Sequence, residues 1–369
     1  MWPGVIRLDL ARVPSPTSLL GLEVFSGLSL LGMPVACAPV ARPVAPSFPG
    51  LGAAAKLLGT QIGREGVSRT APVPGHSLRT STSVSSGGDN AHAKVDLMNL
   101  DLHIHSTASD GAVSPAEVVK RAVQGRLDVI ALTDHDTMAG LELAMEAARG
   151  EAIEIIPALE VSTTWDTTEL HILGYFVDPS DPALRAHDGV AGERRAQRLE
   201  AMVGRLSDQG VDVSFDSVVA QAGEDTASLG RPHLARALQE AGYVQTVPEA
   251  FDRFIGNDHA AYIPTQLLDP EAAIQMIHGA GGIAIWAHPP MYLLAELLPD
   301  LVRMDLDGIE VYRPRNSPAR VMELEGAAAA AGLQVLSGGS DWHSPDDGEL
   351  GDFVVDSRQI GAFLERGGM

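Results

Sequence analysis

Short apolar runs alternate with helical stretches from Met98 onward, and this alternation is the feature that most restricts the fold. Repeated strand and helix units of this kind are typical of α/β proteins with a mostly parallel sheet. Ser114, Pro115 and Glu117 mark the start of the first helix as an N-cap, a first-turn proline and a capping-box acid. We expect strands near residues 99–104, 128–133, 154–159, 170–176, 282–287, 308–312 and 334–337, and helices near residues 114–125, 141–149, 270–279 and 318–331.

Residues 181–262 interrupt this alternation. The predicted strands stop there, and the segment is polar with a helical periodicity that is clearest at residues 193–209 and 234–241. We interpret the segment as an inserted, mainly helical cap subdomain within a domain of residues 98–369.

Residues 1–97 differ from the rest of the chain, since they are rich in Pro, Gly, Ser and Ala and have no sustained periodicity. Such a segment lacks the pattern needed to bury a core, so we expect a disordered tail or a mis-assigned start before Met98. The apolar run at residues 18–41 also resembles the core of a signal peptide. Glu23 and several glycines and prolines inside that run favour a cytoplasmic protein instead.

Charge and cysteine content restrict the possible ligands. The formal net charge of -22 argues against binding to duplex DNA, which needs clustered positive charge. The single cysteine, Cys37, excludes a disulfide framework or a thiolate metal cluster, so His, Asp and Glu must hold any metal. The last lysine is Lys120, and the fixed cations after it are arginines, which suit bidentate phosphate recognition.

His103 and His105 lie two residues apart on the first predicted strand, so both side chains project from the same face. Other His, Asp and Glu residues follow later predicted strands, and in a barrel of parallel strands the carboxyl ends form one rim. This joint placement favours a metal site over separate structural hydrogen bonds. The candidate metal ligands are His103, His105, Asp110, His135, Glu160, His171, His288, Asp341 and His343.

The remaining histidines, apart from His233, do not follow this pattern, and we interpret them as incidental. They are His76 and His92 in the tail, His187 and His259 in predicted polar loops, and His278 on a predicted helix.

Several short motifs stand at these positions: Asp101-Leu102-His103-Ile104-His105-Ser106, Ser109-Asp110-Gly111, Thr133-Asp134-His135-Asp136, Glu160, Leu170-His171-Ile172-Leu173-Gly174-Tyr175, Gly230-Arg231-Pro232-His233, Ala287-His288-Pro289 and Gly339-Ser340-Asp341-Trp342-His343. Together they resemble the polymerase and histidinol phosphatase (PHP) superfamily. Within it the chain is similar to phosphoesterases that include nucleoside 3',5'-bisphosphate phosphatases and a 5'-trimming ribonuclease. The resemblance covers about residues 98–369 and implies a distorted (β/α)7 barrel with an inserted cap.

The resemblance also implies two or three divalent metal ions. The oxygen and imidazole ligands suit Mn²⁺, Zn²⁺ or Fe²⁺, and the sequence does not distinguish among these metals. The segment Asn257-Asp258-His259 departs from the family, because relatives tend to carry basic residues there. This departure affects the prediction of the substrate's identity and leaves the predicted metal ligands unchanged. The implied sets are His103, His105, Glu160 and Asp341 for one ion, Asp110, His135 and His343 for a second, and Glu160, His171 and His288 for a third.

We therefore expect a metal-dependent phosphoesterase that hydrolyses phosphate monoesters by metal-activated water. Its expected partner is a small phosphorylated substrate, either a nucleoside 3',5'-bisphosphate or the 5' end of a short RNA. We expect no association with a membrane. Arg231 and His233 are the candidates for binding a second phosphate or assisting the leaving group. Weaker candidates of the same kind are Arg194, Arg195, Arg313 and Arg315.

Four other functions remain open at this point. Amidohydrolases also begin with a His-x-His strand, but they usually bridge their metals with a modified lysine, and Lys120 lies on a predicted helix. Histidinol phosphate is an alternative substrate, and a polymerase-type exonuclease is disfavoured by the acidic charge. A metal-stabilised module without enzymatic activity would need only a closed set of four ligands, fewer than the candidates present.

Overall fold

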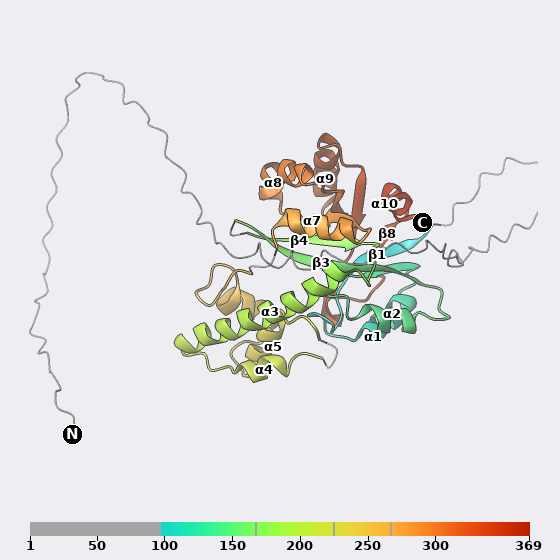
Figure 1. Ribbon diagram of the computed structural model, residues 1–369. Helices are drawn as coiled ribbons and strands as arrows, with labels where there is room; N and C mark the ends of the chain where they lie inside the picture. Colours follow the sequence, from blue (N-terminus) through green and yellow to red (C-terminus); the bar gives the residue numbers. More distant parts are fainter. Residues whose placement is uncertain (1–96, 167, 224–225, 266–267) are drawn as a thin grey trace, which may run out of the picture. The chain divides into compact units, whose positions relative to one another are not determined.

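The computed structural model describes residues 97–166, 168–223, 226–265 and 268–369 (Figure 1). The tail predicted for residues 1–97, with its alternative signal peptide, lies outside these ranges except for Leu97. Among the helices of the described ranges, none has both the length and the apolar character that a membrane span requires.

An eight-stranded mixed sheet is the centre of the fold, in the order β7-β6-β5-β4-β3-β2-β1-β8. Four neighbouring pairs are parallel: β1 with β2, β2 with β3, β5 with β6, and β6 with β7. Each strand predicted from the sequence is present, and the short β8 is an addition that pairs antiparallel with β1. The strands are β1 (Asn99–Ile104), β2 (Val129–Leu132), β3 (Glu154–Trp165), β4 (Thr168–Tyr175), β5 (Ile283–Trp286), β6 (Gly308–Tyr312), β7 (Val335–Gly338) and β8 (Val355–Asp356).

The expectation of a mostly parallel sheet is wrong for β4, which runs antiparallel to both β3 and β5. β3 and β4 form a hairpin in which Trp165 pairs with Thr168, so only residues 166 and 167 separate the paired positions. A connection this short cannot return a strand in the parallel direction, because that needs a crossover of about a dozen residues or more. As part of this hairpin, β3 extends beyond the predicted end at residue 159.

The sheet nearly closes into a barrel where the residues after β7 meet the carboxyl end of β1. The Asp341 amide donates to the carbonyl of His103 over 2.8 Å, and the His105 amide donates to the carbonyl of Trp342 over 2.9 Å. At Gly339 a Cβ atom would lie 2.3 Å from the His103 nitrogen, so the close approach requires glycine. The segment that carries Asp341 therefore lies beside the segment that carries His103.

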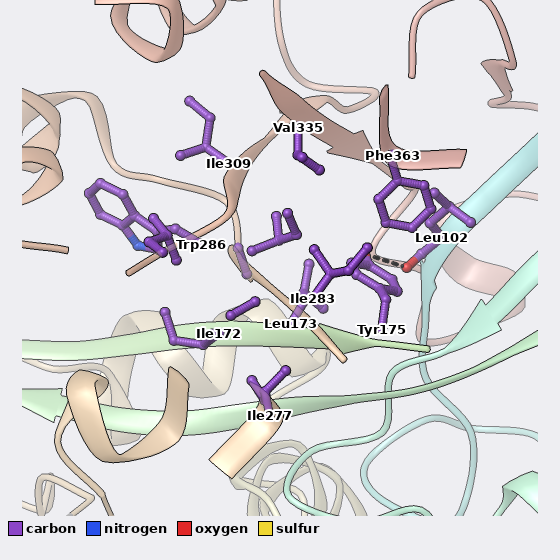
Figure 2. Packing of buried hydrophobic residues seen from close by; sticks show 14 of the residues in the cluster. Leu102, Ile172, Leu173, Tyr175, Ile277, Ile283, Trp286, Ile309, Val335 and Phe363 are labelled. Carbon is purple, nitrogen blue, oxygen red and sulfur yellow. Dashed lines mark hydrogen bonds between the residues drawn. The ribbon is translucent and has the colours of Figure 1, made fainter. Parts of the chain in front are cut away.

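Helices pack on the sheet around a hydrophobic core (Figures 1 and 2). The rings of Tyr175 and Phe363 meet edge to face with centroids 5.0 Å apart, and the Tyr175 hydroxyl donates to the Leu102 carbonyl over 2.8 Å. At Gly174 of β4 a Cβ atom would come within 2.9 Å of Ile277 Cγ1, which shows how closely the neighbouring helix approaches. These helices are α1 (Pro115–Gln124), α2 (Leu141–Ala147), α7 (Pro270–Gly279), α8 (Met291–Arg303), α9 (Pro318–Ala330) and α10 (Gly361–Gly367), with a 3₁₀ turn at Pro345–Asp347.

The helices of residues 182–255, which precede α7 in the segment between β4 and β5, have a hydrophobic core of their own that includes Leu199, Leu206 and Leu238. We call these helices the cap. The first of them begins eleven residues before the predicted start at residue 193, because Asp181 caps it and Pro182 occupies its first turn. The cap comprises α3 (Pro182–Asp208), α4 (Phe215–Val219), α5 (Arg231–Glu240), α6 (Val247–Ala250) and a π-helical turn at Phe251–Ile255.

Candidate metal centre

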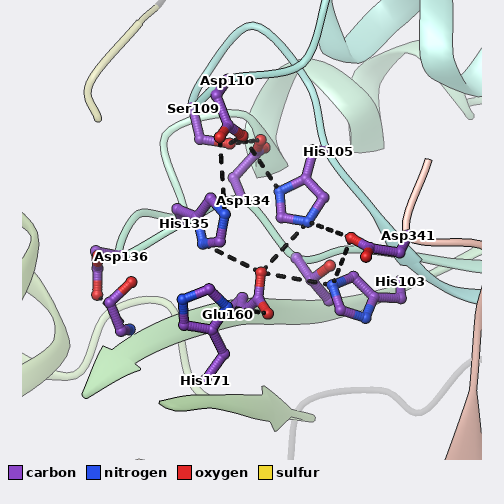
Figure 3. A network of polar contacts seen from close by, with 12 residues as sticks. His103, His105, Ser109, Asp110, Asp134, His135, Asp136, Glu160, His171 and Asp341 are labelled. Carbon is purple, nitrogen blue, oxygen red and sulfur yellow. Dashed lines mark hydrogen bonds and ion pairs between the residues drawn. The ribbon is translucent and has the colours of Figure 1, made fainter. Parts of the chain in front are cut away.

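The nine candidate ligands come from six strands or the segments that follow them, and the fold brings all nine into one cluster. Seven of them follow β1, β2, β5 and β7 or lie at the end of β1, as expected for a rim. Glu160 and His171 differ, because they lie inside β3 and β4, where the hairpin carries both strands past the rim. Figure 3 shows most of the cluster converging on the Glu160 carboxylate.

The first group consists of His103, His105, Glu160 and Asp341 (Figure 3). The Nε2 atoms of His103 and His105 lie 3.4 and 3.3 Å from Glu160 Oε2. The same nitrogens lie 3.4 and 3.5 Å from Asp341 Oδ1. Two ligands bound about 2.1 Å from one ion at a tetrahedral angle are about 3.4 Å apart. The four atoms therefore have the spacing of ligands that share an ion.

The second group is centred on Asp110. His343 Nε2 lies 3.5 Å from Asp110 Oδ1, and His135 Nε2 lies 3.7 Å from Asp110 Oδ2. His105 Nδ1 also lies 3.7 Å from Asp110 Oδ1, so this ring stands between the first and second groups. The implied second set is thus assembled, with His105 beside it.

The third group uses the other oxygen of Glu160. His171 Nδ1 and His288 Nε2 each lie 3.0 Å from Glu160 Oε1 and 3.2 Å from each other. His135 Nδ1 approaches Glu160 Oε2, the oxygen of the first group, to 3.1 Å. His135, Glu160 and His171 also lie close enough together to share an ion, so His135 stands beside all three groups. The two oxygens of one buried carboxylate therefore face different groups of histidines.

Several atoms at the centre are buried and lack a hydrogen-bond partner among the described residues: both ring nitrogens of His105, His103 Nε2, His135 Nδ1 and Glu160 Oε2. An unsatisfied buried polar atom costs about 1 to 3 kcal/mol. A set of five such atoms, with ligand spacing and made only of imidazole and carboxylate, fits divalent cations.

Burial lowers the pKa of His135 to about 3, so its ring is neutral and can donate a lone pair to a metal. For His171 burial also acts to lower the pKa, but Glu160 and Glu169 outweigh it and raise the pKa to about 10. His171 therefore carries a proton when no cation is bound, and a cation in the third group has to displace that proton.

Glu310 of β6 is a functional residue that sequence reasoning missed. It is fully buried, and its Oε1 accepts a hydrogen bond from His103 Nδ1 over 2.9 Å. Its Oε2 accepts from the amide of His288 over 2.7 Å. A carboxylate behind a ligating histidine fixes the tautomer and the orientation of the ring. The signal was a single acid inside the otherwise apolar strand Gly308–Tyr312.

Asp134 is a second supporting group that its sequence motif alone does not indicate. Its carboxylate accepts from the amide and hydroxyl of Ser106 and from the hydroxyl of Ser109, each over 2.7 Å. These bonds fix the loop that carries Asp110.

The predicted position of His187 in a polar loop is wrong. His187 lies on α3 and its Nε2 is 2.9 Å from Oδ1 of the buried Asp136. Arg195, one of the weaker phosphate candidates, donates from Nε to Asp136 Oδ2 over 2.7 Å and is itself buried. Asp136 has a left-handed backbone with φ of 59° and directly follows His135. The cap is thus tied to the residue next to a candidate ligand.

Arg231 and His233 lie at the start of α5. The Arg231 guanidinium stands 5.3 Å from the ring centroids of both Phe251 and Tyr262, and its Nη1 donates to Asn257 Oδ1 over 2.8 Å. His233 is buried, and its Nδ1 accepts from the Gly230 amide over 3.0 Å. Neither residue lines the cavity described next.

A cavity of about 860 Å³ adjoins the metal centre, with Asp110, Asp341 and His343 in its wall. Arg313 and Arg315, both weaker candidates from the sequence, also line it, and Arg313 Nη2 donates to Asp341 Oδ2 over 2.5 Å.

The chain is similar to several known proteins. The PHP domain model matches residues 101–265. The 5'-3' exoribonuclease Rnm of Escherichia coli is 35% identical over 254 residues, which cover 66% of this chain and 85% of the relative. The 3',5'-nucleoside bisphosphate phosphatase of Chromobacterium violaceum is 34% identical over 257 residues, which cover 68% of this chain and 90% of the relative.

Two solved structures share the fold. One, described as an amidohydrolase from Chromobacterium violaceum with bound sulfate and no metal, is 34% identical with a TM-score of 0.64 and covers 68% of this chain and 89% of its own. The other, a candidate metal-dependent phosphoesterase from Bifidobacterium adolescentis, is 31% identical with a TM-score of 0.65 and covers 73% of this chain and 96% of its own. The predicted fold class and the predicted enzyme class, a metal-dependent phosphoesterase, are confirmed. The chain belongs to the PHP domain family.

Proposed function

We propose that the nine clustered residues bind two or three divalent cations, Mn²⁺, Zn²⁺ or Fe²⁺, and that the protein hydrolyses phosphate monoesters of nucleotides. The proposed substrates are nucleoside 3',5'-bisphosphates or the 5' ends of short RNA. The observation that carries the proposal is the buried Glu160 carboxylate, whose two oxygens face separate groups of histidines at 3.0 to 3.4 Å. The names of the exoribonuclease and bisphosphate phosphatase relatives support the substrate class.

Bound divalent ions supply Lewis-acid stabilisation of phosphate oxygens and lower the pKa of water. The protein's own residues prepare the site. Glu310 holds His103 with Nε2 directed at the first group, and Asp134 holds the loop of Asp110. Because these supports are buried and already hydrogen bonded, the ligands need little rearrangement on binding.

Arg231 is proposed to bind a substrate phosphate outside the metal groups. Within the described residues it has no carboxylate at ion-pair distance, and its guanidinium is held in place by two aromatic rings. His233 is proposed to support it by fixing the start of α5, since its ring accepts from the Gly230 amide. An arginine with a preset orientation loses less entropy when it forms a bidentate phosphate contact.

A phosphate-release screen of the purified full chain tests the proposal. We expect Mn²⁺-dependent release from adenosine 3',5'-bisphosphate and from 5'-phosphorylated short RNA, and less from histidinol phosphate or p-nitrophenyl phosphate. The Glu160→Gln variant serves as the inactive control. Release from histidinol phosphate alone would contradict the proposed substrate class, and the absence of release from every ester would contradict the proposed activity.

A further inference from the structure

The cavity beside the metal centre lies between the cap and the segments that follow β6 and β7. Its volume of about 860 Å³ is near the upper end of the range for small-ligand pockets, roughly 300 to 1,000 Å³. Because Asp110, Asp341 and His343 form part of the wall, a phosphate at the metal centre has direct access to this space. The cavity therefore has room for more of the substrate than the phosphate that reacts.

Three arginines face the cavity from two sides. Arg236 of α5 donates from Nη2 to the Asp110 carbonyl over 2.7 Å, and Arg313 is held by Asp341. Both are anchored on residues of the metal centre. Arg315 differs, because it is exposed and has no hydrogen-bond or ion-pair partner within the part of the chain that the structure describes. Its guanidinium is therefore not tied to another residue of that part and can bind an anion in the cavity.

Two carboxylates outside the metal centre, Asp346 and Asp347, also line the cavity. Asp347 Oδ2 accepts from the amides of His343 and Ser344 over 3.2 and 3.0 Å, so it is engaged in holding the loop. If Asp110 and Asp341 bind cations, the remaining charged residues of the wall are three arginines and the two acids Asp346 and Asp347. Among the described lining residues there is no Phe, Tyr or Trp on which a base could stack.

We propose that this cavity binds the single-stranded nucleic acid that adjoins the reacting phosphate, and that Arg315 and Arg236 bind its backbone phosphates. The inference rests on the proposed function and deepens it, because it selects a polynucleotide over a mononucleotide. Without an aromatic side chain in the wall, bases have no ring to stack on, so phosphate contacts should dominate and the binding should depend little on base sequence. Arg231 lies outside this lining and represents a separate phosphate contact.

Fluorescence anisotropy of a labelled RNA hexamer with a non-hydrolysable 5'-phosphonate, titrated with the full chain in Mn²⁺, tests the inference. Arg315→Gln should weaken binding about tenfold. It should also reduce the slope of log affinity against log salt by about 0.7, the value for one lost single-strand phosphate contact. Arg236→Gln should act in the same direction. Arg303→Gln, which removes an exposed arginine of α8 that pairs with Asp300, is the matched control and should change neither quantity.

The inference is overturned if Arg315→Gln and Arg236→Gln both behave like the Arg303→Gln control. It is equally overturned if the unmutated protein binds the hexamer no more tightly than adenosine 5'-monophosphate. Hexamer binding that depends on Arg315, in a protein that releases phosphate from no ester, would support this site and contradict the proposed activity, so the two failures are distinguishable.

Discussion

At the scale of single residues, the metal centre depends most on Glu160, because its two oxygens face all the histidines of the first and third groups. Glu160→Gln removes one ligand oxygen and the negative charge that both groups share. We expect metal content to fall by at least one ion per chain, and to fall further than in His171→Ala, which affects the third group alone. Elemental analysis of dialysed protein measures this. Glu154→Gln, at the exposed start of the same strand, should retain full metal content.

Glu310 provides a second test at this scale, because it contacts His103 without facing the ion positions itself. Glu310→Gln replaces an acceptor of the His103 Nδ1 hydrogen by an amide, and supporting groups of this kind are worth roughly 10- to 100-fold in metal affinity. A competitive Mn²⁺ titration should show that loss. Glu325→Gln is the matched control, since Glu325 accepts from the Tyr312 hydroxyl and not from a histidine. Equal Mn²⁺ affinities in the two variants would contradict the supporting role of Glu310.

The candidate ligands could be predicted from the sequence because they stand in short motifs, and all except Glu160 and His171 lie at or after a strand end. Their supports could not, because the contacts join distant positions: Glu310 meets His103 across 207 residues, and His187 meets Asp136 across 51. No local pattern marks such a pair. His187 in particular reads as a surface residue until the long helix α3 places it against the barrel.

At the scale of elements, α3 is tied to the barrel through Arg195 and Asp136, both nearly fully buried. Arg195→Met leaves the Asp136 carboxylate buried with one ion-pair partner removed, which typically costs about 3 to 5 kcal/mol. Urea unfolding monitored by circular dichroism should show a loss of this size. Arg194→Met, at the preceding position of the same helix, is the comparison. A loss that is no larger for Arg195 than for Arg194 would mean that the buried pair does not stabilise the fold.

Most helices and strands could be predicted, because hydrophobic periodicity and helix-capping residues are local features of the sequence. Ser114 accepts from the Glu117 amide as expected of an N-cap. The relative direction of paired strands could not be predicted, because the apolar runs of β3 and β4 have the same pattern whether the strands are parallel or antiparallel. The reversal follows from the two-residue connection after Trp165, and it places Glu160 and His171 inside a hairpin.

At the scale of the whole molecule, all nine candidate ligands lie between residues 103 and 343. We therefore propose that residues 1–97 contribute nothing to the metal centre or to folding of the remainder. A chain that starts at Met98 should be soluble, with the same metal content and the same phosphate release as the full chain. Loss of soluble protein on this truncation would contradict the proposal.

Metal removal should also lower the stability of the molecule, because the ligands belong to strands throughout the sheet and bind ions only when it is folded. A ligand at 100 times its dissociation constant stabilises the folded state by about 2.7 kcal/mol. For a domain of the size of residues 98–369 one ion then corresponds to roughly 5 °C in Tm. We expect EDTA to lower the Tm in differential scanning fluorimetry by at least this amount, and added Mn²⁺ to restore it. In Glu160→Gln the same treatment should have a smaller effect, since fewer ions are left to remove. An equal EDTA effect in both proteins would show that the chelated ions lie elsewhere.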